Sequence, residues 1–284
     1  MNQAILERIQ EIKKRYCWEP VQPLELKNVP FPLDNVFFTL AGDGSIFFCA
    51  GTNELGKVSS SGEMLWIKPD VKEAGGAATL YWDSLLNKLW VCDHNSGDIT
   101  LLSEDGKTVF RKKINVALPY RIVRAKEHLL LVDIKGEALL VLDSEANVLE
   151  KVKFPSDLTS PFKIKDVFHF EGKTWALCVD AQNPSSSFSV RLLNENGKIE
   201  GKVFEERFNG EKKLALHLIV DRQGMFYVFD KYGSAFKFNA QGNKIFEQWE
   251  TRVFRSVFYQ SPFLFFTVAN SSLIQKVKIE TNPA

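Results

Sequence analysis

The amino-acid sequence predicts an all-β fold, a six-bladed β-propeller of four-stranded blades closed by an N-terminal strand, with one short N-terminal α-helix. Three observations lead to this prediction. Two turn markers recur along the chain about 40 to 50 residues apart, and each interval holds short apolar runs that alternate with turn residues. The composition also favours strands, because the chain of 284 residues contains 23 Phe and only 3 Met.

The first segment of the chain predicts the single helix. Ile5, Ile9, Ile12 and Tyr16 follow helical spacing with charged residues between them, so an amphipathic helix is expected over residues 3–16. We expect this helix to pack against the body. The alternative is docking to a partner or a membrane surface, and its mixed charges argue against a membrane. We assign residues 1–20 to the helix and its lead-in, and residues 21–284 to one propeller domain.

The two markers define the repeating unit. The first is the end of the second strand, and its residues lie 39 to 50 positions apart: Gly51, Asp93, Asp133, Asp180, Asp230 and Ala269. The second is the turn after the third strand, with residues 41 to 50 positions apart: Gly62, Gly106, Asn147, Gly197 and Gly242. Glycine and asparagine suit such turns because they tolerate a positive φ. Four strands in each period are typical of a β-propeller.

The predicted blades follow from these markers. They cover approximately residues 35–69, 77–113, 119–154, 162–204, 214–250 and 253–282. The last blade lacks a fourth strand before the chain ends, and residues 24–29 are expected to supply it, which closes the ring and leaves no open blade. A polar insertion over residues 180–187 explains the longer fourth unit.

The blade at 214–250 shows the pattern most clearly. Its core reads VDRQGMFYVFD over residues 220–230 and FKFNAQG over residues 236–242, and residues 89–93 (LWVCD) repeat part of it. These units resemble NHL-type repeats, of a divergent kind, and more broadly the six-bladed propellers of the YWTD and gluconolactonase-like groups. The resemblance implies a propeller fold and carries little information about activity.

Charge and cysteine content limit the classes of function. Lys+Arg 36 against Asp+Glu 35 leaves a formal net charge of +1, so the chain has no global field that attracts nucleic acid or an anionic membrane. We therefore expect neither partner, and we expect a monomer. The absence of an apolar leader and the lack of CxxC spacing favour a cytoplasmic protein with free thiols. We expect Cys49, Cys92 and Cys178 to be buried in equivalent strands.

One group of side chains is a candidate ligand site. The first strands of the blades are expected to line a central channel, and cations lie near their starts. If they converge at the channel mouth, they form a ring that binds a carboxylate or phosphate. The alternative is that each side chain reaches solvent or pairs with a neighbour such as Asp166. The predicted ligand-binding residues are Tyr120, Arg121, Lys163, Lys165, His217 and Arg255.

Other constellations were weighed against simpler structural explanations. Asp93, Asp133, Asp180 and Asp230 recur at the same loop position, which predicts acceptors that stabilise turns rather than a metal site. No Ser/His/Asp order, HExxH or P-loop pattern occurs, so no catalytic residue, metal or cofactor is predicted. Among the histidines, only His217 is expected near the channel, and His94 is expected in a surface loop.

These observations favour a non-enzymatic binding or scaffold propeller that presents loops on one face to a protein or a small anionic ligand. The alternative is a propeller hydrolase or lyase, lactonase-like, with its site at the mouth of the channel. The first hypothesis requires only a rigid ring with variable loops. The second requires convergent acid, base or metal-binding side chains from several blades.

Overall fold

The structure is a computed structural model of the whole chain. It describes residues 18–20, 23–25, 36–50, 54–68, 78–94, 96–135, 137–153, 162–208, 213–249, 254–268 and 273–279. The helix predicted over residues 3–16 lies outside these ranges. The described residues form strands and turns, and no helix long and apolar enough to cross a membrane occurs among them.

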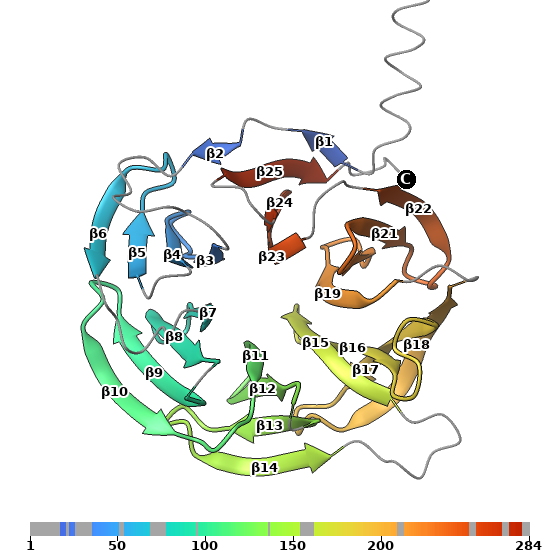
Figure 1. Cartoon of the computed structure of the whole chain (residues 1–284), viewed down its shortest axis with the longest axis horizontal. Helices are drawn as coiled ribbons and strands as arrows, with labels where there is room; N and C mark the ends of the chain where they lie inside the picture. The colour runs from blue at the N-terminus through green and yellow to red at the C-terminus, as the bar shows by residue number, and fades with distance from the viewer. Residues whose placement is uncertain are drawn as a thin grey trace, which may run out of the picture.

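Six antiparallel sheets are arranged around a central axis, which confirms the predicted six-bladed propeller (Figure 1). The first strand of each blade is innermost, and the fourth strand forms the outer edge. Blade 1 contains β3 (Phe37–Leu40), β4 (Ile46–Ala50), β5 (Glu54–Val58) and β6 (Met64–Lys68). Blade 2 contains β7 (Ala78–Asp83), β8 (Lys88–Asp93), β9 (Asp98–Ser103) and β10 (Thr108–Lys113). Blade 3 contains β11 (Pro119–Ala125), β12 (His128–Asp133), β13 (Ala138–Leu142) and β14 (Val148–Lys153).

The second half of the ring repeats this order. Blade 4 contains β15 (Phe162–Phe170), β16 (Lys173–Asp180), β17 (Ser187–Leu193) and β18 (Ile199–Arg207). Blade 5 contains β19 (Ala215–Val220), β20 (Phe226–Asp230), β21 (Ser234–Phe238) and β22 (Lys244–Trp249). Blade 6 contains β23 (Phe254–Gln260), β24 (Phe263–Val268) and β25 (Leu273–Ile279). The strands of blade 4 are the longest, and β18 continues three residues past the predicted end of its blade at 204.

The N-terminal part of the chain closes the ring. Two short strands, β1 (Trp18–Pro20) and β2 (Leu24–Glu25), both pair antiparallel with β25 along the outer edge of blade 6. The closing strand was predicted over residues 24–29. The structure shows two pairing segments instead, of which β1 was not predicted, and residues 26–29 lie outside the described ranges. Backbone hydrogen bonding between the two ends of the chain thus covers the edge of the last blade.

The turn between the third and fourth strands has the same construction in five blades. A Ser, Asp or Asn side chain accepts a hydrogen bond from the backbone N–H four residues later, for example Asn239 Oδ1 from Asn243 at 2.8 Å and Asp143 Oδ1 from Asn147 at 2.8 Å. The residue before that N–H has a positive φ, as at Gly242 with 81°. In blade 3 this residue is Ala146 with 58°, so the assignment of that position to Asn147 was wrong by one residue.

The hydrophobic core lies between blades rather than inside one sheet. Each blade has two faces, and each face packs against the neighbouring blade. Phe47 of blade 1 stacks on Trp82 of blade 2 at 5.0 Å between ring centroids, and Phe229 of blade 5 meets Phe254 of blade 6 at 5.0 Å. The middle strands are therefore buried at most positions, and in β13 all five residues are apolar and buried.

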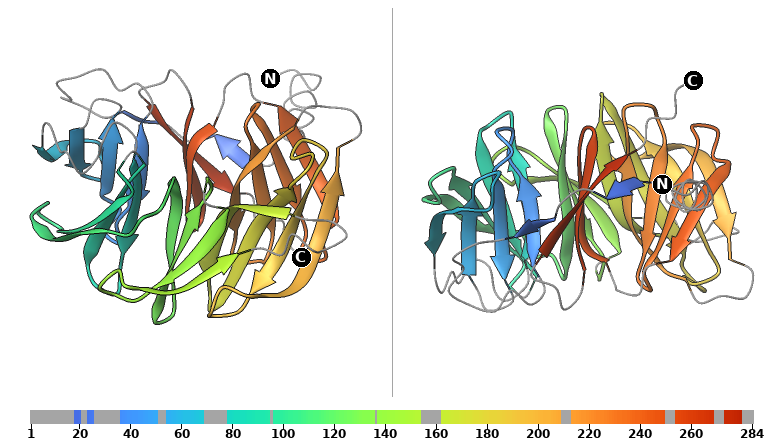
Figure 2. Two further views of the ribbon diagram at one scale, coloured as in Figure 1. Left: turned by 60° about the horizontal axis from the view of Figure 1, so that its bottom comes forward. Right: turned by 90° about the horizontal axis from the view of Figure 1, so that it is seen from above.

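Two opposite faces of the disc carry the connections, and the strands run between them (Figure 2). We call the face with the loops between second and third strands and the connections between blades the loop face. We call the opposite face the turn face. It carries the turns between the first and second strands and those between the third and fourth strands. Both openings of the channel are rimmed by the ends of the first strands.

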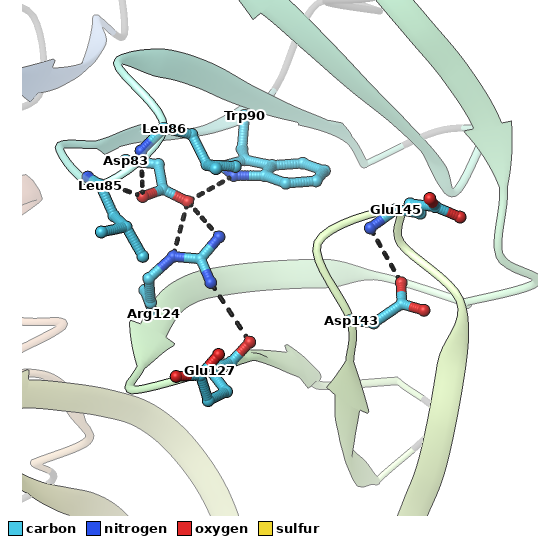
Figure 3. A network of polar contacts seen from close by, with 8 residues as sticks. All are labelled: Asp83, Leu85, Leu86, Trp90, Arg124, Glu127, Asp143 and Glu145. Atoms are coloured by element: carbon cyan, nitrogen blue, oxygen red, sulfur yellow. Dashed lines mark hydrogen bonds and ion pairs between the residues drawn. The ribbon is translucent and has the colours of Figure 1, made fainter.

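A buried carboxylate links blades 2 and 3 near the turn face (Figure 3). Asp83 is fully buried, and its Oδ2 accepts hydrogen bonds from Arg124 Nε at 2.8 Å and from Trp90 Nε1 at 3.1 Å. Its Oδ1 accepts from the backbone N–H of Leu85 at 3.2 Å and of Leu86 at 3.3 Å, which shapes the β7–β8 turn. One side chain thereby joins a turn, a core tryptophan and the neighbouring blade.

Replacing Asp83 with alanine is expected to destabilise the protein by about 3–5 kcal/mol, because it leaves the buried Arg124 guanidinium and the Trp90 N–H without their acceptor. The matched control is Asp143→Ala, which removes a more exposed turn carboxylate and is expected to cost about 1 kcal/mol. Urea unfolding of both variants measures the two costs. Equal losses of stability would show that the link between blades contributes nothing beyond its turn.

Candidate functional site

A β-bulge turns a ring of side chains toward the channel. In the first strands of blades 3 to 6 the pairing register shifts by one residue, and the skipped residues are Tyr120, Lys165, Leu216 and Arg255. The residue after each bulge resumes pairing at an equivalent level of the ring, and these residues are Arg121, Asp166, His217 and Ser256. A bulge redirects side chains locally, and here it sets which residues face the axis.

Side chains from different blades meet across the channel at this level. Tyr120 of blade 3 stacks on His217 of blade 5, with centroids 6.0 Å apart and planes 18° apart. The Arg121 guanidinium of blade 3 lies 4.9 Å from the ring centroid of Phe258 in blade 6. The cavity that these residues line, together with Ser256, has a volume of only about 30 Å³. The channel is therefore nearly closed at the level of the bulges.

His217 is buried in this wall with an unused nitrogen. It is 5% exposed, and its Nε2 has no hydrogen-bond partner among the described residues. Burial, with a smaller effect from the charge of Arg121, lowers the pKa of His217 to about 3. The imidazole is thus neutral at physiological pH, and His217 is one of the residues that line the small cavity.

A buried ion pair links three blades around the same cavity. Arg121 Nε lies 3.3 Å from Asp166 Oδ1, and Asp166 Oδ2 accepts a hydrogen bond from the backbone N–H of Leu218 at 2.9 Å. Asp166 is fully buried, so desolvation raises its pKa to about 6 although Arg121 opposes the shift. The charges of Arg121 and Asp166 thus compensate each other. Pairing with Asp166 was the alternative to ligand binding that the sequence left open for Arg121.

The predicted lysines lie on β15, the inner strand of blade 4. Lys163 Nζ pairs with Glu137 Oε1 of blade 3 at 2.5 Å, and both side chains are partly exposed. Burial and the like charge of Lys163 lower the pKa of the half-buried Lys165. Arg255 occupies the equivalent bulge of β23, and its side chain lies outside the described part. Three of the six predicted residues, Tyr120, Arg121 and His217, therefore line one cavity, whereas the two lysines lie apart from its lining.

His94 lies in the loop between β8 and β9, as predicted, but its side chain is half-buried and reaches Thr79, which lines the channel cavity. Its Nε2 forms a hydrogen bond of 2.9 Å with Thr79 Oγ1, and Thr79 also donates to the backbone oxygen of Tyr120 at 2.5 Å. Burial lowers the pKa of His94 to about 4. The prediction that only His217 lies near the channel was therefore wrong. The sequence signal that could have identified His94 is its place directly after Asp93, at the loop-face end of β8.

The recurring aspartates stabilise turns and connections, as predicted. Asp180 Oδ1 accepts from the N–H of Gln182 at 2.8 Å, and Asp230 Oδ1 accepts from Ser234 at 2.7 Å. Asp133 accepts from Leu118 at 2.9 Å, and Asp93 from the Ser96 hydroxyl at 2.8 Å. Among the described residues no group of three or more His, Cys, Asp or Glu side chains is arranged to hold a metal ion. Cys49, Cys92 and Cys178 are buried, as predicted, and Cys92 and Cys178 are free thiols.

Comparisons with known proteins identify the fold and no family. No protein-family model matches the sequence, and no curated protein matches it. Among solved structures the chain is similar to a streptogramin B lyase, with 15% identity, a TM-score of 0.65, and coverage of 94% of this chain and 90% of that one. It is also similar to BamB from Moraxella catarrhalis, with 12% identity, a TM-score of 0.55, and coverage of 92% and 99%.

A third similar structure is the C-terminal WD40 domain of Sif2, with 11% identity, a TM-score of 0.58, and coverage of 89% of this chain and 84% of that one. Identities this low show the propeller fold alone. The set includes a lyase and a WD40 domain, so the fold alone does not decide between the hypotheses. The NHL-type resemblance stays a prediction.

Two buried groups of the channel are expected to give opposite pH effects on stability. From pH 7 to pH 4 the unfolded chain protonates His217 but the native protein does not, so His217 lowers the stability on acidification. Native Asp166, whose pKa is about 6, takes up its proton before the unfolded chain does, so it raises stability over the same range.

Urea unfolding at pH 4 and pH 7 tests these signs. Relative to the wild type, His217→Gln is expected to lose less stability on acidification, and Asp166→Asn is expected to lose more, on the order of 1 kcal/mol or above in each case. Shifts of the same sign in both variants would contradict the assignment.

Proposed function

We propose that the protein is a non-enzymatic binding propeller that holds an acidic group at the loop-face mouth of its channel. The observation that carries this proposal is the closure of the channel, which leaves about 30 Å³ among Tyr120, Arg121 and His217. Such a volume holds one or two waters. A larger ligand therefore meets the rim and the loops rather than the interior.

The charges of the rim favour an acidic ligand. Lys165 sits half-buried beside Lys163, and burial, together with the smaller effect of the like charge of Lys163, lowers its pKa. A carboxylate or phosphate placed between them would relieve this repulsion. Glu137, which now pairs with Lys163, is an exposed partner, and exposed ion pairs contribute little, so a ligand can replace it at small cost.

The acidic group could come from a small molecule or from the side chains of a protein partner. Both sources share the same chemistry, and a rigid ring with variable loops serves either. We further propose a cytoplasmic protein, because the buried free thiols of Cys92 and Cys178 suit a reducing compartment, and we propose that it is a monomer.

Thermal unfolding in the presence of inorganic phosphate, citrate and an acidic peptide tests the proposal. Binding is expected to raise the Tm of the wild type, because a ligand that prefers the native state stabilises it by mass action. Lys165→Glu is expected to abolish the shift. The matched control is Lys173→Glu, which makes the same change at an exposed residue on the turn face and is expected to leave the shift intact. A wild type that shifts with none of the three ligands contradicts the proposal.

A lyase or hydrolase is the second candidate, and one observation favours it. His217 lines the channel cavity with a neutral imidazole, the form that accepts a proton in general-base catalysis, and its Nε2 has no hydrogen-bond partner among the described residues. The similarity in fold to a streptogramin B lyase makes streptogramin B a reasonable first substrate to test.

Incubation with streptogramin B, followed by chromatography and mass spectrometry, separates the two candidates. The binding hypothesis predicts no consumption above the rate without protein. Turnover by the wild type that is lost in His217→Ala and retained in His128→Ala would instead establish an enzyme whose base is His217.

A further inference from the structure

A second and larger cavity opens at the turn-face end of the channel. Its volume is about 250 Å³, and it reaches from the β3–β4 turn at Gly42 and the β7–β8 turn at Ser84 inward to Arg121. A dry cavity of about 150 Å³ binds benzene. The turn-face cavity is therefore large enough for a molecule of one or two rings, in contrast to the small cavity on the other side of Arg121.

Aromatic side chains from blades 2, 4 and 6 form a large part of the wall. Phe170 and Tyr259 meet edge to face with centroids 5.8 Å apart, and Phe168 lies 6.4 Å from Phe170 at 33°. These contacts hold the rings in place before any ligand arrives, so little side-chain freedom is lost on binding. The six aromatic residues of the wall are Tyr81, Trp82, Phe168, Phe170, Phe258 and Tyr259.

The polar part of the wall is positive. The guanidinium groups of Arg121 and Arg124 line the cavity, whereas their partners Asp166 and Asp83 are fully buried and do not. The cavity thus meets the cationic ends of two ion pairs whose anionic ends lie behind them. Among the described residues of its lining there is no carboxylate. A ligand that carries a negative charge is favoured over a cation.

Each arginine has a different capacity for a ligand. Arg124 is occupied, because Nε and Nη2 donate to Asp83 and Nη1 donates to the backbone oxygen of Glu127 at 3.3 Å. Arg121 contacts Asp166 through Nε alone, and that N–H makes no hydrogen bond within the described residues. Arg121 is therefore the group that can bind a carboxylate, and Arg124 contributes its charge.

We propose that the turn-face cavity is a binding site for a small planar aromatic carboxylate, with its ring against Phe170 and Tyr259 and its carboxylate toward Arg121. An aromatic ring stacks on such a wall by offset or edge-to-face contacts, and a guanidinium binds a carboxylate with geometric preference. The site does not depend on the proposed acid binding at the loop face, because the closed part of the channel lies between the two.

Isothermal titration with benzoate and 2-naphthoate tests the chemistry of the site. Three further compounds serve as comparisons. Cyclohexanecarboxylate has a ring that is not aromatic, benzyl alcohol has the aromatic ring without the charge, and acetate has the charge without a ring. Both aromatic acids are expected to bind, and benzyl alcohol is expected to bind about tenfold more weakly or worse, because it loses a hydrogen bond to a charged group. Acetate binding as tightly as benzoate, or no binding of either aromatic acid at millimolar concentration, would overturn the proposal.

Substitutions locate the site and separate it from the loop face. Ser84→Trp places a bulky side chain at the rim and is expected to abolish binding of 2-naphthoate, while Ser144→Trp, in an exposed turn away from the cavity, is expected to leave it unchanged. Phe170→Leu is expected to weaken binding about two- to tenfold. Lys165→Glu, which tests the loop-face proposal, should have no effect here. Unchanged binding in Ser84→Trp would overturn the proposal even if the aromatic acids bind elsewhere.

Discussion

The structure depends on the burial of both faces of every blade. A four-stranded antiparallel sheet whose middle strands are apolar on both sides cannot stand alone in water, so each blade must pack against two neighbours. A ring satisfies this requirement for all six blades at once. It also brings the first strands together around one axis, where any polar side chain has to find a partner or face a small cavity. The channel chemistry is thus a consequence of how the core is built.

The buried ionic groups show how the ring meets that requirement. Asp83 and Asp166 each occupy a first strand, each accepts backbone N–H groups, and each contacts an arginine of blade 3. A buried carboxylate is costly unless such donors surround it. The two aspartates differ in the result: Asp83 accepts a close, doubly bonded guanidinium, whereas Asp166 has a looser ion pair and a raised pKa.

The sequence predicted the repeat well because turns are local. Ser, Asp or Asn begins the turn after each third strand in five blades, and a residue of positive φ follows three positions later. This turn marker gave the period, and the six recurring ends of the second strands gave the number of blades. The sequence could not predict the bulges, because a one-residue register shift depends on how β11, β15, β19 and β23 pack against each other. Those bulges precede Arg121 and His217 in their strands and so help to decide that Tyr120, Arg121 and His217 share a cavity.

Arg121 divides the channel into two environments with different chemistry. On one side of it lie His217, Tyr120 and a cavity of about 30 Å³, and on the other lie Phe170, Tyr259 and a cavity of about 250 Å³. Its guanidinium rests on Phe258 and is held by a carboxylate that faces neither cavity. A cation fixed in this way keeps one charge available to both sides while the ring remains closed. The two cavities therefore differ in size and lining although one guanidinium borders both of them.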